Sequence, residues 1–162
     1  VELGLQTIHE KTALKIRRGY PLSCFEQTVK ELQKRNIPVI VHIILGLPGE
    51  STKEVLETIE YLNALGIQGI KLQLLHILKD TDLAKELPTL SLLSEEEYIA
   101  LLLQCIAHLS PDIVIHRLTG DGPKELLLAP LWSLHKRHVL NRIAHQLKEE
   151  QIYQGMDYQK KK

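Results

Sequence analysis

The stretch IPVIVHIILGLPGES, residues 37–51, decides the fold of this chain of 162 residues. Val, Ile and Leu fill its first part without strict polar alternation, which is typical of a strand buried on both faces. The run then reaches Gly46 and Gly49, and Ser51 with Glu54 forms a capping box that begins a helix. The segment therefore predicts a buried strand, a turn and a helix, which is the repeating unit of parallel α/β folds.

Three more apolar runs and four more helical patterns surround this unit. The runs cover residues 1–6, 67–78 and 113–118, and the strongest run is 37–47. Further helices are predicted from Thr7 toward Arg18, after Ser23, after Ser94 and over about 133–150, the first three with capping-box spacing. Strands that alternate with helices predict parallel pairing with right-handed crossovers.

The predicted fold class is α/β, a partial TIM-type (β/α) barrel of about four strand–helix units with a C-terminal helical extension. A closed barrel needs about 250 residues, and four buried strands would leave open edges through which copies of the chain could associate. Because the sequence also begins at Val1 inside a predicted strand, we expect a fragment of a longer protein. Residues 1–110 are expected to form the barrel part, 111–150 the extension and 151–162 a frayed polar tail.

The composition argues against several classes of protein. Lys plus Arg and Asp plus Glu each number 20, so the zero formal charge gives no global attraction to nucleic acid or anionic membrane. The apolar runs are shorter than the roughly 20 residues of a membrane span, and no signal-peptide pattern follows Val1. Cys24 and Cys105 are too few for a disulfide framework, a Cys₄ zinc site or a self-contained iron–sulfur cluster. We expect a soluble, cytoplasmic protein with no metal site in this chain.

Polar residues and glycines at the predicted strand ends are the candidate site, because parallel α/β folds place function there. Gln6 ends the first strand, and its amide can bond sugar hydroxyls. Arg18 offers a fork for a carboxylate. Gly46 and Gly49 permit close approach by a ligand or a backbone. The plain alternatives are an exposed glutamine, a surface arginine and an ordinary β–α turn.

Together these segments resemble the radical SAM superfamily, in the branch that contains anaerobic coproporphyrinogen oxidase and the elongator catalytic subunit. VELGLQT (1–7) resembles its fourth-strand motif, HIILGLPGES (42–51) its fifth, and KLQLLHILKDTDLA (71–84) its sixth strand and exit. The whole chain, with RLTGDGP (117–123) and the region of Trp132, is similar to one bacterial subgroup. The resemblance implies a barrel that begins at its fourth strand.

The resemblance implies that eight residues bind S-adenosylmethionine. Gln6 would bond the ribose, and Arg18 would pair with the methionine carboxylate. The other six are His42, near the ribose, Ile44 and Gly46, against the adenine, and Leu75, His76 and Ile77, whose backbone would bond the adenine edge.

The resemblance also implies a 4Fe-4S cluster with ligands upstream of residue 1, because the superfamily's three-cysteine loop is absent from this chain. A reduced cluster, supplied by an electron donor, would pass an electron to the cofactor's sulfonium, giving methionine and a 5′-deoxyadenosyl radical that takes a hydrogen atom from the substrate. This chain alone is expected to be inactive. Several relatives modify tRNA, so a tRNA substrate is the hypothesis by analogy.

The alternative interpretation is a non-catalytic α/β module that binds RNA or protein. The HKRH segment (135–138) places Lys136 and Arg137 on the predicted last helix, where they form either an RNA-binding patch or a solvated basic face. These two cations also disfavour metal binding by the flanking histidines. RLTGDGP is either a substrate loop or a turn, and residues 79–82 are either substrate contacts or a solvated loop.

Overall fold

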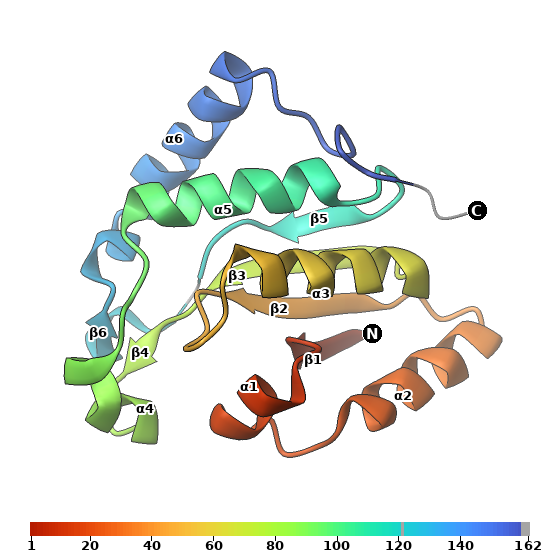
Figure 1. The fold of residues 1–162 in the computed structure, drawn as a ribbon, viewed down its shortest axis with the longest axis horizontal. Coiled ribbons are helices and arrows are strands. Elements are labelled where there is room, and N and C mark those ends of the chain that lie inside the picture. The colour runs from red at the N-terminus through yellow and green to blue at the C-terminus, as the bar shows by residue number, and fades with distance from the viewer. Residues whose placement is uncertain (121, 160–162) are drawn as a thin grey trace.

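A computed structural model describes residues 1–120 and 122–159 and places four strands in one parallel sheet (Figure 1). The sheet consists, in spatial order, of β1 (Glu2–Gln6), β2 (Ile40–Leu45), β3 (Gly69–Leu74) and β5 (Val114–Arg117). All three pairings are parallel, and the spatial order follows the chain. Parallel strands in sequential order form a barrel segment, whereas a doubly wound sheet reverses its order.

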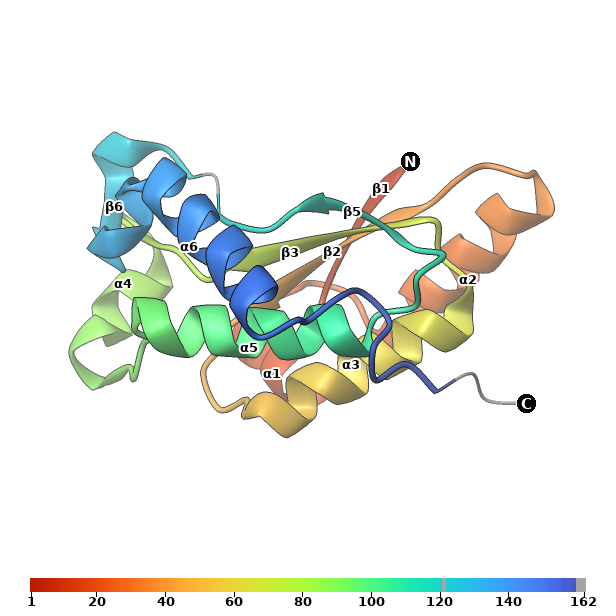
Figure 2. The same ribbon diagram turned by 90° about the horizontal axis from the view of Figure 1, so that it is seen from above.

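The helices between these strands cover one face of the sheet (Figure 2). They are α1 (Glu10–Lys15), α2 (Leu22–Lys34), α3 (Thr52–Leu65) and α5 (Glu95–His108). In β2, Val41, Ile43 and Leu45 are buried toward the helices, while the alternate residues His42 and Ile44 remain partly exposed. Helices on a single face confirm the partial barrel.

We call the opposite side of the sheet the open face. Strand side chains alternate between faces with a period of two, and β3 follows the same pattern as β2. Because Leu5 and Ile70 belong to the buried core, Glu2, Gly4 and Lys71 lie on the open face with His42.

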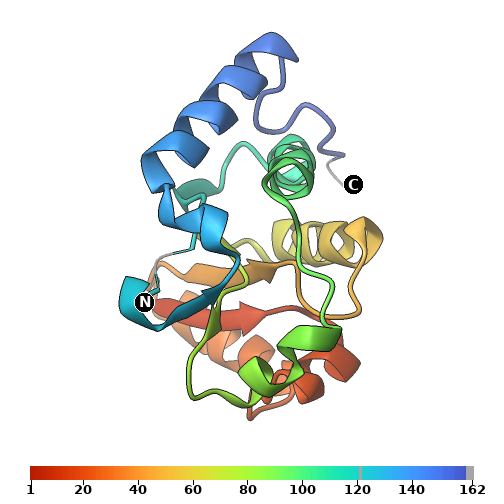
Figure 3. The same ribbon diagram turned by 90° about the vertical axis from the view of Figure 1, so that its left-hand side faces the viewer.

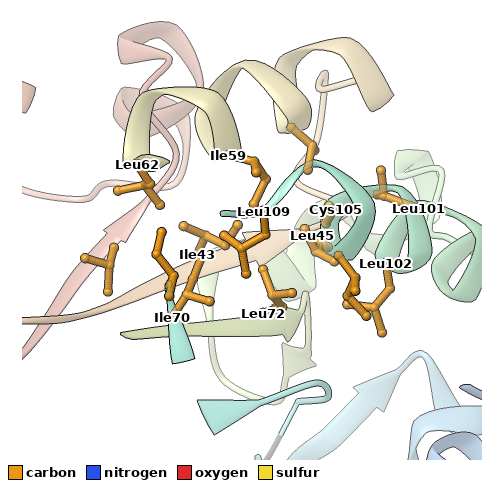
Figure 4. Packing of buried hydrophobic residues seen from close by; sticks show 14 of the residues in the cluster. Ile43, Leu45, Ile59, Leu62, Ile70, Leu72, Leu101, Leu102, Cys105 and Leu109 are labelled. Carbon is orange, nitrogen blue, oxygen red and sulfur yellow. The ribbon is translucent and has the colours of Figure 1, made fainter. Parts of the chain in front are cut away.

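The core lies between the sheet and helices α3 and α5 (Figure 4). It is mainly aliphatic, as the aromatic content of 4% requires. Its central side chains include Ile43, Leu45, Ile59, Leu62, Ile70, Leu72, Leu102 and Cys105. Burying each large aliphatic side chain contributes about 1.5–3 kcal/mol, so this layer fixes the strands on which the candidate residues stand.

Two of the four predicted capping boxes are confirmed. The Ser51 side chain and Glu54 cap α3 reciprocally, and Ser94 with Glu97 does the same for α5. Gly66 ends α3 in the left-handed conformation, as a C-terminal glycine commonly does.

The capping boxes predicted at Thr7 and Ser23 are wrong. Helix α1 begins after His9, because the Thr7 hydroxyl accepts a hydrogen bond from the His9 backbone at 3.1 Å instead of capping a longer helix. Helix α2 begins after Pro21, and the Glu10 carboxylate accepts from the first helical N–H, that of Leu22.

The third apolar run divides into two strands. The first ends at Leu74, and β4 (Ile77–Leu78) then pairs antiparallel with β6 (Leu127–Ala129), a strand that the sequence did not predict. Helix α4 (Asp82–Glu86) follows β4. Short 3₁₀ helices cover Leu87–Thr89, Lys124–Leu126 and Leu131–Leu134.

Helix α6 (Lys136–Glu149) packs outside α5, at the periphery of the molecule (Figure 3). The prediction of a frayed tail is wrong for residues 151–159, which return to the end of α5. The Gln154 side chain donates to the backbone oxygens of Ser110 and Ile113, both at 2.7 Å. Residues 160–162 lie outside the described part. None of the described helices is long and apolar enough to cross a membrane.

Candidate functional site

A pocket of about 520 Å³ lies at the carboxyl ends of the first strands. Its lining includes Gln6, Arg18, Ile44 and Leu75, which are four of the eight residues predicted from the sequence. The volume falls within the roughly 300–1,000 Å³ of small-molecule sites. We call it the strand-end pocket. Its remaining lining residues are Lys15, Ile16, Arg17, Tyr20, Leu47, Thr81, Asp82, Leu83 and Glu86.

Gln6 occupies a strained turn at the end of β1. Its φ of 62° is unusual for a residue other than glycine, and Thr7 N–H donates to the Leu5 carbonyl across it at 2.8 Å. Such conformations cost about 1–3 kcal/mol and cluster at binding sites. Within the described structure, Gln6 Oε1 is buried and has no hydrogen-bond partner. A buried acceptor of this kind is a group that a ligand hydroxyl would satisfy.

Arg18 stabilises this turn with a side chain that is only 1% exposed. Nη1 donates to the carbonyl oxygens of Leu5 and Thr7 at 3.3 and 2.8 Å, on either side of Gln6. Nε donates to the Tyr20 carbonyl at 2.8 Å, and Nη2 donates to Glu10 Oε1 at 2.9 Å. Of the five guanidinium N–H groups, these bonds to described residues leave one for a ligand.

One side of the pocket belongs to α4, which the sequence did not predict. An ion pair joins Arg17, just after α1, to Asp82, at the start of α4. Lys85 also pairs with Asp82 at 2.8 Å, and this bond is the main cause of the lowered pKa of that carboxyl. The sequence feature that could have predicted α4 is Thr81, whose hydroxyl accepts from Ala84 N–H as an N-terminal cap.

The other four predicted residues do not line the strand-end pocket. His42 stands on the open face, two residues before Ile44 along β2. Gly46 has a φ of 84°, and a Cβ at this position would approach the Leu93 side chain to 3.0 Å. In this structure the glycine at position 46 therefore allows the Leu93 side chain to lie close to the backbone.

His76 and Ile77 lie beyond the pocket, where the chain leaves β3. Ile77 is fully buried and is the register partner of Ala129. The His76 ring contacts Gly120 and Gly122, and a Cβ on Gly120 would collide with it. The RLTGDGP segment thus packs against the strand exit, although its Asp121 lies outside the described residues.

Glu50 is an ionisable residue that the sequence reasoning missed. It follows β2 and bonds the side chains of Thr7 and Thr12, yet its Oε1 is buried without a partner in the described structure. Burial, which disfavours the charged form, raises the pKa of this carboxyl. The turn at Gln6 is therefore hydrogen-bonded, through the Thr7 side chain, to the partly desolvated carboxyl of Glu50.

The basic residues of α6 are partly neutralised by the start of α5. Arg142 Nη1 contacts Glu95 and Glu96 at 2.8 and 3.0 Å, and His138 lies 3.3 Å from Glu95. This pairing argues against an RNA-binding face at these two residues. Within the described part of the chain, no three His, Cys, Asp or Glu side chains are grouped to hold a metal ion.

Two family models match this chain. The model of the radical SAM superfamily matches residues 1–62, and that of the Radical_SAM C-terminal domain matches residues 67–149. The archaeal Elp3 of Methanocaldococcus infernus, solved with an N-terminal deletion, shares the fold with a TM-score of 0.81 and 15% identity. The match covers 95% of this chain and 37% of that one.

Two curated bacterial proteins are similar in sequence. YtqA of Bacillus subtilis is 43% identical over 162 residues, covering 99% of this chain and 50% of YtqA. YhcC of Escherichia coli is 40% identical over 134 residues, covering 82% of this chain and 43% of YhcC. The chain thus spans about half the length of these relatives. With its C-terminal-domain match over residues 67–149, the chain belongs to the radical SAM superfamily.

Proposed function

We propose that this chain supplies the S-adenosylmethionine-binding part of a radical SAM enzyme, and that the strand-end pocket holds the cofactor. The observation that carries the proposal is Gln6 Oε1, a buried acceptor without a partner in the described structure, on a pocket of suitable volume. A ribose hydroxyl would donate to this oxygen and remove the cost of leaving it unsatisfied.

The rest of the pocket matches the remaining parts of the cofactor. Ile44 and Leu75 offer apolar surface to the adenine ring. The methionine end carries both a carboxylate and an ammonium group, and the pocket has cations and carboxylates to meet them, with Arg17 and Glu86 among them. In this proposal Arg18 contacts the methionine carboxylate through its one uncommitted N–H.

Two of the predicted residues, His42 and Gly46, lie outside the pocket lining, and we propose no cofactor contact for them. The backbone of Leu75, His76 and Ile77 would bond the adenine edge.

Bound S-adenosylmethionine, given one electron by a reduced 4Fe-4S cluster, would supply radical chemistry through cleavage of its carbon–sulfur bond. The residues of this chain would bind and orient the cofactor and exclude water from it. The cluster ligands and the electron donor are proposed to come from outside these residues.

The test is binding of S-adenosylhomocysteine to this chain, measured by isothermal titration calorimetry. Gln6→Ala should weaken binding roughly fivefold, the factor expected for one lost hydrogen bond. Lys79→Ala is the control, since Lys79 is exposed and lies outside the pocket lining. Equal affinities for wild type and Gln6→Ala would remove Gln6 from the site.

Anaerobic iron–sulfur reconstitution tests the location of the cluster. A site with three closely spaced thiolates is needed, and this chain offers only Cys24, exposed, and Cys105, buried. The chain should yield no stoichiometric 4Fe-4S absorption. A stoichiometric spectrum would contradict the proposal that the ligands lie elsewhere.

A further inference from the structure

A row of ionisable side chains crosses the open face of the sheet, outside the strand-end pocket. Glu2, His42 and Lys71 come from three neighbouring strands, and His42 is the register partner of Lys71. Lys71 Nζ donates to Glu2 Oε1 at 2.6 Å, and His42 Nε2 lies 3.0 Å from Glu2 Oε2. We call these three residues the open-face row.

The Glu2 carboxylate sets the hydrogen-bonding state of the His42 ring. An ionised carboxylate only accepts hydrogen bonds, so the ring nitrogen that faces it, Nε2, carries the proton. Burial, and then the charge of Lys71, lower the pKa of His42, which favours the neutral ring. With the proton on Nε2, Nδ1 of the neutral ring is an acceptor.

The Lys71 ammonium and the His42 ring bond the two oxygens of the same Glu2 carboxylate, so they lie close to each other. The Lys71 side chain is 13% exposed, and its bond to Glu2 uses one of the three ammonium hydrogens. The adjacent strands bring the two side chains to neighbouring positions, about 5 Å apart at the backbone. An acceptor beside a cation complements an oxyanion that carries its own hydroxyl hydrogen.

The charges of Glu2 and Lys71 offset each other within the row, and Arg117 adds positive charge next to it. The positive charge of Arg117 also lowers the pKa of His42. The His116 ring lies on the same face, over Gly69, where a Cβ would approach it to 2.6 Å. Glu2, the one carboxylate in the row, already has both oxygens engaged by Lys71 and His42.

The row adjoins the strand-end pocket. Gly4 is the register partner of His42, and Gln6 Nε2 lies only 2.5 Å from the place of a Gly4 Cβ. The Gln6 amide therefore lies over the strand position next to His42. A ligand on the row and a ligand at Gln6 would share one face of the sheet.

We propose that the open-face row is a second binding site, which takes a hydroxyl-bearing oxyanion of the substrate through Lys71 and His42. Its assignment to the substrate rests on the proposed function, because the open face of a barrel segment is the side that faces the barrel interior. In this assignment His42 contacts the substrate.

Inorganic phosphate and sulfate provide the test without any variant. Near pH 8 the two ions have about the same charge and shape, but only hydrogen phosphate carries a hydroxyl. Each is titrated into this chain while the His42 ring resonances are followed by NMR. Phosphate should bind roughly fivefold more tightly than sulfate, the factor expected for one additional hydrogen bond. Equal affinities, or no response of the His42 ring, would overturn the proposal.

Three variants assign the two contacts. His42→Phe should reduce phosphate binding to the level of sulfate and leave sulfate unchanged. Lys71→Met should weaken both ions, and the exposed Lys79→Met should change neither. A phosphate preference that survives His42→Phe would contradict the role of His42.

The cofactor proposal is tested separately in the same samples. S-adenosylhomocysteine should shift the Gln6 side-chain amide resonances whether or not phosphate is present. If that shift is retained while phosphate fails to reach His42, the open-face site is wrong and the cofactor pocket stands. If phosphate binds as expected and the Gln6 shift is absent, the cofactor proposal is the one that fails.

Discussion

The Arg18 guanidinium donates to the carbonyl oxygen of Thr7 at 2.8 Å, immediately after the strained Gln6 turn. The same nitrogen reaches the Leu5 carbonyl on the other side of the turn. A planar fork with fixed donor directions can hold two backbone carbonyls at once, which a lysine ammonium does less well. The position of the Gln6 amide therefore depends on a residue that is almost completely buried.

Arg18→Lys should damage both stability and binding. The loss of charged hydrogen bonds to buried carbonyls is expected to lower the free energy of unfolding by about 2 kcal/mol, measured by urea denaturation. S-adenosylhomocysteine affinity should fall more than it does in Lys79→Ala. Equal affinities in these two variants would show that Arg18 neither binds nor positions a group in the pocket.

Gly4→Ala should separate binding from folding. A Cβ at Gly4 would lie 2.5 Å from Gln6 Nε2, so the Gln6 side chain must move. Replacing a strand glycine by alanine otherwise tends to stabilise by roughly 0.5–1 kcal/mol. We expect weaker binding of S-adenosylhomocysteine with thermal stability retained. Undiminished binding would show that the placement of Gln6 over Gly4 has no role in the site.

Glu50→Gln should stabilise the protein at neutral pH. The folded pKa of Glu50 is raised by burial, so the native state binds the proton more tightly than the unfolded chain does. Stability is therefore lost as pH rises from the unfolded pKa through the folded pKa, and the penalty persists above that window. Glutamine keeps the shape without the charge.

The check is the difference in unfolding free energy between wild type and Glu50→Gln across the pH range. It should be largest at neutral pH and vanish below about pH 4, where both side chains are neutral. Glu125→Gln, at an exposed residue, is the matched control. A difference that is independent of pH would show that the charge of Glu50 is not the cause.

The sequence predicted the fold better than the details of the site. Gln6 and Arg18 could be identified because a strand-end glutamine and a downstream arginine are local patterns. The hydrogen bonds of Arg18 to two carbonyl oxygens could not be predicted, because they depend on how the chain turns after β1. The α4 side of the pocket was missed because a five-residue helix has too short an apolar pattern to predict.

The open-face row shows a second limit of sequence reasoning. Glu2, His42 and Lys71 are far apart in the chain and meet only through the strand register. A shift of one residue would turn each side chain to the opposite face. His42 was a candidate only through the resemblance to the radical SAM superfamily, and its partner Glu2 was not a candidate.

The two cysteines should differ sharply in reactivity. Cys24 is exposed on α2, whereas Cys105 is fully buried in the core, and burial raises the pKa of its thiol to about 12. Because the thiolate is the reactive form, the native protein should react with one equivalent of Ellman's reagent near pH 8 and with two in denaturant. Rapid reaction of two thiols in the native protein would contradict the burial of Cys105.

Ser51→Ala should show how much the turn after β2 depends on the α3 capping box. Loss of an N-terminal serine cap costs about 1 kcal/mol, measured by urea denaturation near neutral pH. Ser23→Ala is the matched control, because Ser23 is exposed on α2 and makes no such cap. An equal effect of the two substitutions would contradict the capping role of Ser51.

Ser51→Ala should also change the pKa of the Glu54 carboxyl. The Ser51 hydroxyl, and then its backbone N–H, lower the pKa of Glu54 to about 2. A depressed folded pKa gives stability that is present above the unfolded pKa near 4.5 and is lost as pH falls toward 2. In Ser51→Ala the backbone donor remains and the hydroxyl is gone, so the Glu54 pKa should rise toward its usual value. A carboxyl ¹³C titration of Glu54 measures this shift, and an unchanged midpoint would mean that the hydroxyl does not bond the carboxylate.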